Sequence, residues 1–182
     1  MTWSRRRVLT AGGALAGMSA AGLLPGNAFS QEGNARRIAL WNLHTDERLD
    51  IEYFRRGAYL PDALAAIDAL LPDFRTGERH DIAPSLMDYL VEVARAAGVD
   101  PAFSVISGYR SAQTNAGLRE KNGGVAQRSL HMEGRAIDVR VSGVNCADLA
   151  AHAENLRRGG VGYYRASDFV HLDTGAFRTW KG

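Results

Sequence analysis

Two histidines and an aspartate in the second half of the chain have the types and spacing of metal ligands. His131 and Asp138 lie seven residues apart in SLHMEGRAIDVR, and His171 lies between carboxylates in DFVHLDTG. Two histidines and one carboxylate, with a fourth position open, form the ligand set of a catalytic rather than a structural zinc site. The spacing alone also fits surface or hydrogen-bonded polar residues, so the elements that position these side chains matter.

Residues 135–141 (RAIDVRV) alternate in polarity as the residues of a half-buried β-strand do. The apolar side chains share one face, which we expect to pack on a core, and Asp138 lies on the opposite face. His131 comes shortly before this strand. Gly134 lies between the two and lets the chain bend, so that both side chains can converge on one point.

We expect another strand at residues 168–173 (DFVHLD). By the same alternation His171 shares a face with Asp173, whereas Asp168 lies on the other face. His171 is therefore a polar side chain on a strand whose other residues are mostly typical of a protein core.

The remaining pattern predicts an α+β fold. A hairpin is expected at residues 36–54, and further strands and helices follow along the chain. Strands are expected at 102–108 and 159–164, and helices at 60–71, 83–98, 111–121 and 146–158. This order favours a mainly antiparallel sheet flanked by helices over a doubly wound parallel sheet.

Residues 1–30 have the pattern of an export signal. Three arginines precede a weakly apolar run over residues 8–24, and residues 28–30 fit a small-residue cleavage site. Paired arginines before an apolar residue and a leucine are typical of a twin-arginine signal. The alternative is a membrane anchor, for which the apolar run has about the minimum length, ~17 residues, and contains several glycines. We expect a cleaved signal at 1–30, one domain at 31–182, and a periplasmic location without a stable membrane span.

Charge and cysteine content narrow the function classes. The formal net charge of +2 includes three arginines and no acid from residues 1–30, so the remainder carries −1. A nearly neutral chain gives no support to nucleic-acid binding. Cys146 is the one cysteine, so an intrachain disulfide is excluded and no local cysteine-peptidase signature is present. A G-x-S-x-G elbow for a serine mechanism is also missing from the sequence.

Three ordered motifs carry a resemblance to a known family. They are SGYRSAQTNAGLR at residues 107–119, S-x-H-x-x-G-x-A-x-D at 129–138, and GVGYY followed by FVHLDTG. Together they resemble the zinc D-Ala-D-Ala-type peptidases related to the hedgehog signalling domain, and most of all the murein endopeptidase K branch. The resemblance covers roughly residues 35–180. It implies a hedgehog/DD-peptidase-like fold and a Zn²⁺ cofactor held by His131, Asp138 and His171.

The resemblance also implies substrate-binding residues. Arg110 maps to the family arginine that binds substrate and stabilises charge near the scissile carbonyl, as a permanently charged fork can do. The alternative for Arg110 is a structural ion pair. Ser129 is a candidate for hydrogen bonding to substrate or to a ligand, and a turn role explains it equally well.

Two acids are candidates for the general base. Many family members carry a glutamate three residues before the last histidine ligand, and Asp168 fills that slot here. Strand parity favours Asp173 instead, because it shares a face with His171, while a β-bulge would bring Asp168 in. A further alternative has Asp173 orient a ligand.

The sequence therefore predicts an exported zinc peptidase that hydrolyses peptide crosslinks of peptidoglycan. The resemblance implies cleavage between two diaminopimelate residues, with the D-Ala–diaminopimelate bond as a second candidate. The peptidoglycan peptide stems are the expected partner. A carboxypeptidase or dipeptidase of the same superfamily, and a non-catalytic peptidoglycan-binding module, are the alternatives.

Overall fold

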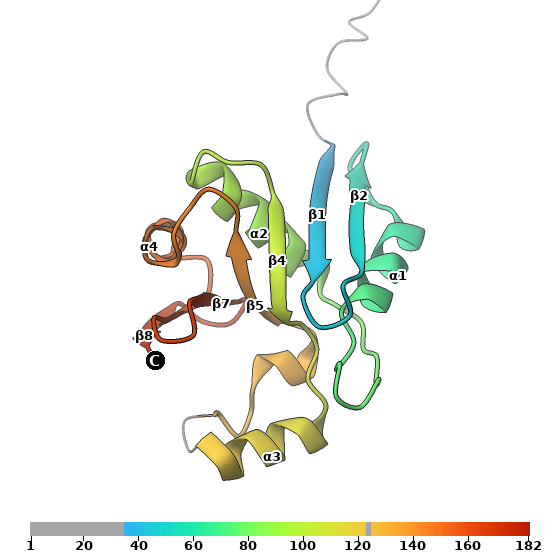
Figure 1. Cartoon of the computed structure of the whole chain (residues 1–182). Helices are drawn as coiled ribbons and strands as arrows, with labels where there is room; N and C mark the ends of the chain where they lie inside the picture. Colours follow the sequence, from blue (N-terminus) through green and yellow to red (C-terminus); the bar gives the residue numbers. More distant parts are fainter. Residues whose placement is uncertain (1–34, 123–124) are drawn as a thin grey trace, which may run out of the picture. The chain divides into compact units, whose positions relative to one another are not determined.

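Eight strands form one sheet, and the two strands with the predicted alternation of apolar and polar residues lie next to each other in it. The computed structural model describes residues 35–122 and 125–182. In it the strands lie in the order β3-β2-β1-β4-β5-β7-β6-β8, and β2, β1, β4 and β5 can be followed side by side in Figure 1. Their bounds are β1 (Arg36–Asn42), β2 (Arg48–Arg55), β3 (Ala58–Tyr59), β4 (Ala102–Ser107), β5 (Ala136–Val141), β6 (Gly160–Tyr164), β7 (Phe169–Asp173) and β8 (Arg178–Lys181).

Most neighbouring strands run antiparallel. The pairs β1–β2, β2–β3, β4–β5, β5–β7 and β6–β7 are antiparallel, whereas β1–β4 and β6–β8 are parallel. The prediction of an α+β fold with a mainly antiparallel sheet is confirmed, although the sheet is mixed. The finer expectation of a hedgehog-like architecture stays a prediction.

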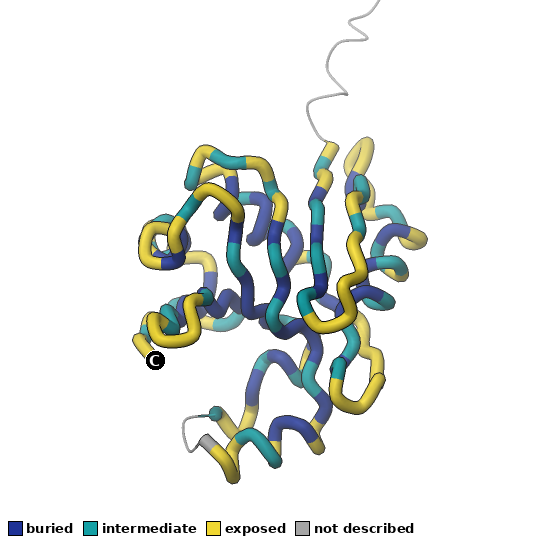
Figure 2. Tube along the Cα trace, viewed as in Figure 1, coloured by how far each residue is buried: buried dark blue, intermediate teal, exposed yellow. Residues whose placement is uncertain are grey.

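Three helices pack on one face of the sheet. They are α1 (Pro61–Leu70), α2 (Pro84–Ala96) and α4 (Cys146–Leu156), and their apolar residues join those of the strands in one core. Proline occupies the first turn of α1 and α2, where its missing N–H costs nothing, and the Asn145 side chain accepts from the N–H of Asp148 to cap α4. Buried residues lie along the strands and the helix surfaces that face them (Figure 2).

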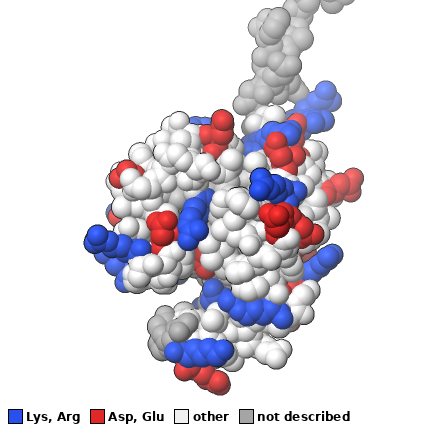
Figure 3. Space-filling view, viewed as in Figure 1, with Lys and Arg blue, Asp and Glu red and all other residues white. Residues whose placement is uncertain are grey.

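The opposite face of the sheet has no such helical layer among the described residues. Alternate residues of β1 and β4, which pair with each other in the sheet, are intermediate or exposed. α3 (Ala112–Asn122) lies beyond the carboxyl end of β4 (Figure 1). Basic and acidic side chains are interspersed over the surface in view (Figure 3).

The expected export signal at residues 1–30 lies outside the described residues. Among the helices that are described, none combines the length and the apolar character needed to cross a membrane.

Candidate metal centre

Asp138 and His171 face each other across two antiparallel strands. Asp138 of β5 pairs with His171 of β7 on one side and with Ser107 of β4 on the other. Directly paired residues have Cβ atoms about 4.5–5.5 Å apart, so the sheet itself brings the two side chains together. The strand residues on either side of them contribute to the core, so both side chains project from the face opposite the helices, and both are buried.

His131 comes from a short 3-10 helix, η3 (Leu130–Glu133), which lies ahead of β5. Gly134 ends this helix with a φ of 63°, in the left-handed region. A side chain at Gly134 would also overlap the carbonyl oxygen of Asp81. Glycine is therefore required here by both conformation and space. The chain does bend at Gly134, and the bend takes the form of a helical turn that the sequence did not predict.

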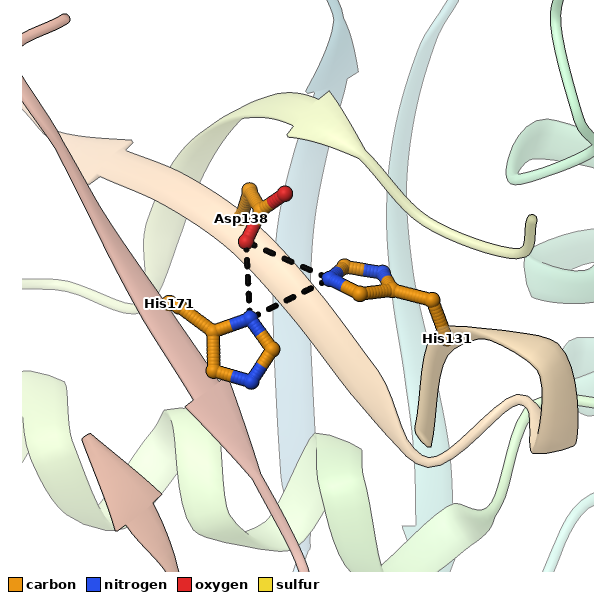
Figure 4. A group of neighbouring side chains, drawn as sticks. All are labelled: His131, Asp138 and His171. Atoms are coloured by element: carbon orange, nitrogen blue, oxygen red, sulfur yellow. Dashed lines mark hydrogen bonds and ion pairs between the residues drawn. The ribbon is translucent and has the colours of Figure 1, made fainter. Parts of the chain in front are cut away.

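The three side chains place one donor atom each at the corners of a small triangle (Figure 4). Nδ1 of His171 lies 2.9 Å from Oδ1 of Asp138 and 3.1 Å from Nε2 of His131. The third edge, from Nε2 of His131 to Oδ1 of Asp138, is 3.3 Å. Ligands held 2.0–2.1 Å from a tetrahedral zinc ion are about 3.3 Å apart, so this donor set fits zinc.

The second nitrogen of each ring is held by a hydrogen bond. His131 donates from Nδ1 to the carbonyl oxygen of Gly108 at 2.7 Å, which leaves the Nε2 lone pair free. His171 donates from Nε2 to Oδ2 of Asp173 at 3.0 Å, so the lone pair of the neutral ring is on Nδ1, the atom that faces the triangle. Such bonds fix the tautomer and the orientation of a metal-binding histidine.

The charges of the cluster favour a bound cation. Burial would lower the pKa of His171, but hydrogen bonds to Asp138 and Asp173 raise it to about 9. Burial lowers the pKa of His131 and so favours its neutral ring. Burial would raise the pKa of Asp138, yet its contacts with both histidines hold it far below the usual range. Without a metal, the raised pKa favours a protonated His171 beside the ionised Asp138, and a bound cation would take the place of that proton.

Arg110 lies beside the carboxylate of the triangle. Its Nη2 is 3.5 Å from Oδ2 of Asp138, and its backbone N–H donates to the carbonyl oxygen of His131. The side chain is 12% exposed, and burial lowers its pKa. Within the part of the chain that the structure describes, Nε of Arg110 has no hydrogen-bond partner. Because an unpaired buried donor is costly, this Nε is suited to an additional acceptor.

Asp173 is wholly buried behind His171. Besides the imidazole, its carboxylate accepts from the N–H groups of Gly160 at 3.1 Å and Gly175 at 2.8 Å, and from Arg178 at 2.6 Å. Burial would raise the pKa of Asp173, but these bonds hold it well below the usual range. Its contact is with Nε2 of His171, whereas Nδ1 of that ring belongs to the triangle. This position suits the alternative expectation, that Asp173 orients a ligand.

Asp168 lies in different surroundings. It precedes β7 with a φ of 50°, and its side chain is 69% exposed. Its carboxylate lies 3.7 Å from Nε of Arg140, whose guanidinium also donates to the Asp168 carbonyl oxygen. The structure does not bring this carboxylate into the cluster.

Ser129 is buried at the start of η3. Its carbonyl oxygen accepts from the N–H of Met132, and its hydroxyl makes no capping bond to the helix. The backbone contact is that of a turn residue, and the expected contact with substrate stays a prediction.

Trp180 and Arg178 of β8 reach the site and were not expected from the sequence. In the sheet, Gly162 of β6 lies between His171 of β7 and Trp180 of β8. A side chain at Gly162 would overlap the indole, whose centroid lies 5.1 Å from that of His171. The alternating glycines Gly160 and Gly162 were the available signal, because glycine inside a strand often marks a close approach.

Comparisons with known proteins extend the motif resemblance to nearly the whole chain. A family model described as peptidoglycan L,D-endopeptidase MepK matches residues 30–180. The chain is 39% identical over 182 residues to the probable peptidoglycan L,D-endopeptidase MepK of Haemophilus influenzae. The matched region covers 98% of this chain and 96% of the relative. The chain is 37% identical over 179 residues to the peptidoglycan L,D-endopeptidase MepK of Escherichia coli K12, with 97% of each covered. No solved structure matches the chain significantly.

The matched range contains all the elements that carry the cluster, from Arg110 to Trp180. The relatives match at high coverage of both chains, so the likeness is not confined to the three motifs. The expected kinship with the murein endopeptidase K branch is confirmed, and the chain belongs to the family described as peptidoglycan L,D-endopeptidase MepK.

Proposed function

We propose that the chain is a zinc-dependent endopeptidase that hydrolyses peptide crosslinks in peptidoglycan. The observation that carries the proposal is the triangle formed by His131, Asp138 and His171, with both rings held in the tautomers that zinc ligands need. The relatives are named as peptidoglycan L,D-endopeptidases, which supports the substrate class. The proposed first target is the bond between two diaminopimelate residues, and the D-Ala–diaminopimelate bond is the second candidate.

The residues around the triangle have separate proposed roles. Zinc bound there would lower the pKa of a bound water to about 7 and polarise the scissile carbonyl. Arg110 offers guanidinium donors to negative charge on the substrate, including the buried Nε that lacks a partner among the described residues. Asp173 holds the proton on Nε2 of His171 and thereby keeps Nδ1 available. Ser129 is proposed as a further contact with the peptide.

The two candidate acids for the base have different surroundings. The oxygens of Asp173 are occupied by the donors described above, and they contact Nε2 of His171 and not the Nδ1 atom of the triangle, which supports an orienting role. Asp168 is exposed and paired with Arg140. Replacement of Asp168 by asparagine therefore tests its candidacy as proton acceptor.

The proposed compartment follows from the substrate. Peptidoglycan lies outside the cytoplasmic membrane, and the twin-arginine pattern of residues 1–30 supports export to the periplasm. Fusion of residues 1–30 to a reporter would test this, with Arg5, Arg6 and Arg7 all replaced by lysine as the control. Loss of export in the lysine variant is expected.

Two other functions would use the same fold differently. A carboxypeptidase or dipeptidase would require a free carboxylate next to the scissile bond, and a binding module would hold peptidoglycan without cutting it. The donor atoms of His131, Asp138 and His171 lie 2.9–3.3 Å from one another, close enough to bind one metal ion. This arrangement favours an enzyme over a non-catalytic binding module.

Digestion of purified sacculi, followed by mass analysis of the released muropeptides, separates these functions. We expect crosslinked dimers to be converted to monomers whose masses identify the L,D bond as the one cut. Release of terminal D-alanine without loss of crosslinks would instead show a carboxypeptidase. Binding to sacculi without any change in the muropeptides would show a non-catalytic module.

A further inference from the structure

Two glycines of β6 let the edge strand β8 reach across to β7. β6 pairs with β7 on one side and with β8 on the other. Gly162 is flanked by His171 and Trp180, and Gly160, on the same face of β6, is paired with Arg178. A side chain at either glycine would overlap the Trp180 ring or the Arg178 guanidinium. The side chains of β8 therefore cross β6 through the space that these glycines leave.

Arg178 uses this space to hold the carboxylate of Asp173. Its Nη1 donates to Oδ1 at 3.1 Å and its Nη2 donates to Oδ2 at 2.6 Å, so the contact is bidentate. Nη1 also donates to the carbonyl oxygen of Ala176, and the guanidinium lies over the Trp180 ring, 5.1 Å from its centroid. A planar fork in this arrangement fixes both carboxylate oxygens at once.

The carboxylate of Asp173, held by Arg178, in turn fixes the orientation of the His171 ring. The Oδ2 atom that Arg178 binds is also the atom that accepts from Nε2 of His171. Asp173 is 0% exposed, whereas the Arg178 side chain is 48% exposed. A continuous series of contacts thus runs from the surface to the side of the His171 ring that faces away from the triangle.

We propose that Arg178 is a positioning residue of the metal centre, acting through Asp173 on His171. The inference rests on the proposed function only in that the triangle binds zinc. Without the guanidinium, a fully buried carboxylate loses its bidentate partner, and the oxygen that orients His171 is no longer fixed. Groups that orient metal-binding histidines typically change metal affinity or activity about 10–100-fold when removed.

Three single variants test the proposal. Arg178→Met removes the charge and the fork, and Arg178→Lys keeps the charge without the fork. Arg135→Met is the matched control, because Arg135 is similarly exposed and donates to Oγ1 and the carbonyl oxygen of Thr174, next to Asp173, without contacting the carboxylate. The measurements are the zinc dissociation constant by chelator competition, the thermal unfolding of the zinc-free protein, and kcat and KM on crosslinked muropeptides.

We expect Arg178→Met to weaken zinc binding about 10–100-fold, with a smaller loss in Arg178→Lys and little change in Arg135→Met. In the Asp173→Asn background, Arg178→Met should cause no further loss of zinc affinity, because Arg178 acts through that carboxylate. The Arg178→Lys variant keeps the test informative if the methionine variant does not fold.

Two results would overturn the proposal. One is a zinc affinity in both Arg178 variants equal to that of Arg135→Met, even if the zinc-free protein unfolds at a lower temperature. The other is full additivity of the Arg178 and Asp173 losses. Failure of the wild-type protein to bind zinc would instead refute the proposed function, so the two failures are distinguishable.

Discussion

In each of His131, Asp138 and His171, one polar side-chain atom faces the triangle and the other contacts a neighbouring group. His131 and His171 use one nitrogen for the triangle and the other for a fixed acceptor. Asp138 uses Oδ1 for the triangle, and its Oδ2 lies beside Arg110. The chemistry of the site therefore depends on which atom faces which neighbour, and single-atom substitutions are the natural tests.

Substitution of the two candidate acids should show that Asp173, and not Asp168, supports zinc binding. We expect Asp173→Asn to weaken zinc binding about 10–100-fold, because the acceptor for Nε2 of His171 is altered. We expect Asp168→Asn to keep both zinc affinity and turnover, because its carboxylate faces Arg140. The measurements are chelator competition and kcat on crosslinked muropeptides. An Asp168→Asn enzyme that binds zinc normally but turns over far more slowly would identify Asp168 as the base.

Arg110 should contribute to turnover more than to metal binding. Arg110→Ala and Arg110→Lys both remove the planar fork, and we expect kcat/KM to fall about 10²–10³-fold, as loss of one oxyanion donor does. Zinc affinity should change little, because Arg110 contacts the oxygen of Asp138 that lies outside the triangle. A loss of zinc affinity as large as the loss of kcat/KM would show a purely structural ion pair.

The faces on which Asp138 and His171 lie were predictable because strand alternation is strict. The period of two is enough to put Asp138 on the face opposite the core and to separate His171 from Asp168. The same parity could not tell which nitrogen of His171 Asp173 would contact. That depends on ring orientation and on Arg178, which approaches from another strand.

At the level of elements, the loop before α2 anchors the segment that carries Arg110. Asp73 accepts from the N–H and the hydroxyl of Ser111 at 2.9 Å and 2.6 Å, and from the N–H of Arg75. Burial would raise the pKa of Asp73, but these hydrogen bonds lower it to about 2. The neighbouring strand β4 and helix α3 are thereby held to this loop.

Asp73 should make stability depend on pH in the acid range. Its folded pKa, about 2, is below the unfolded value of about 3.9, so its contribution of about 2 kcal/mol is present above pH 4 and is lost as pH falls toward 2. Asp73→Asn should lower the free energy of unfolding by about that amount at pH 7, and the difference from wild type should narrow near pH 2. Urea unfolding at pH 7 and near pH 2 measures the difference in the free energy of unfolding. Substitution of the exposed Asp100 by asparagine is the control. An equal loss at both pH values would contradict this assignment.

The glycines of β6 should tolerate no side chain. Gly162→Ala forces a methyl group into the Trp180 ring, so we expect a loss of about 1–3 kcal/mol in the free energy of unfolding. Gly117→Ala is the matched control, because Gly117 lies within α3 with no atom near its missing side chain, and it should gain about 0.5–1 kcal/mol. Urea unfolding gives both values. A Gly162→Ala protein as stable as wild type would refute the close approach of Trp180.

Long elements were predicted from the sequence and short ones were not. The helices at residues 61–70 and 84–96 show clear apolar spacing and proline starts, so their positions were readable. β3, η3 and β8 have two to four residues each, too few for a period to show. The parallel pairing of β8 with β6 depends on tertiary contacts, so no local sequence pattern predicts it.

For the whole domain, the two faces of the sheet have different tasks. Helices α1, α2 and α4 cover one face and complete the core, while the cluster projects from the other. Along β5 and β7, one set of alternate residues packs in the core and the other set faces the cluster. The same strands therefore contribute apolar residues to stability and carry Asp138 and His171. Bound zinc should add to stability by mass action, so a chelator is expected to lower the unfolding temperature of the wild-type protein.

The central claim is that a metal held by this triangle carries out crosslink hydrolysis. The most direct measurement is zinc content together with muropeptide cleavage in the wild-type protein, His131→Ala and the control His152→Ala, a histidine of α4. We predict about one zinc per chain and full cleavage in the wild type and the control, with both lost in His131→Ala. Normal cleavage of crosslinked muropeptides by His131→Ala would contradict the account.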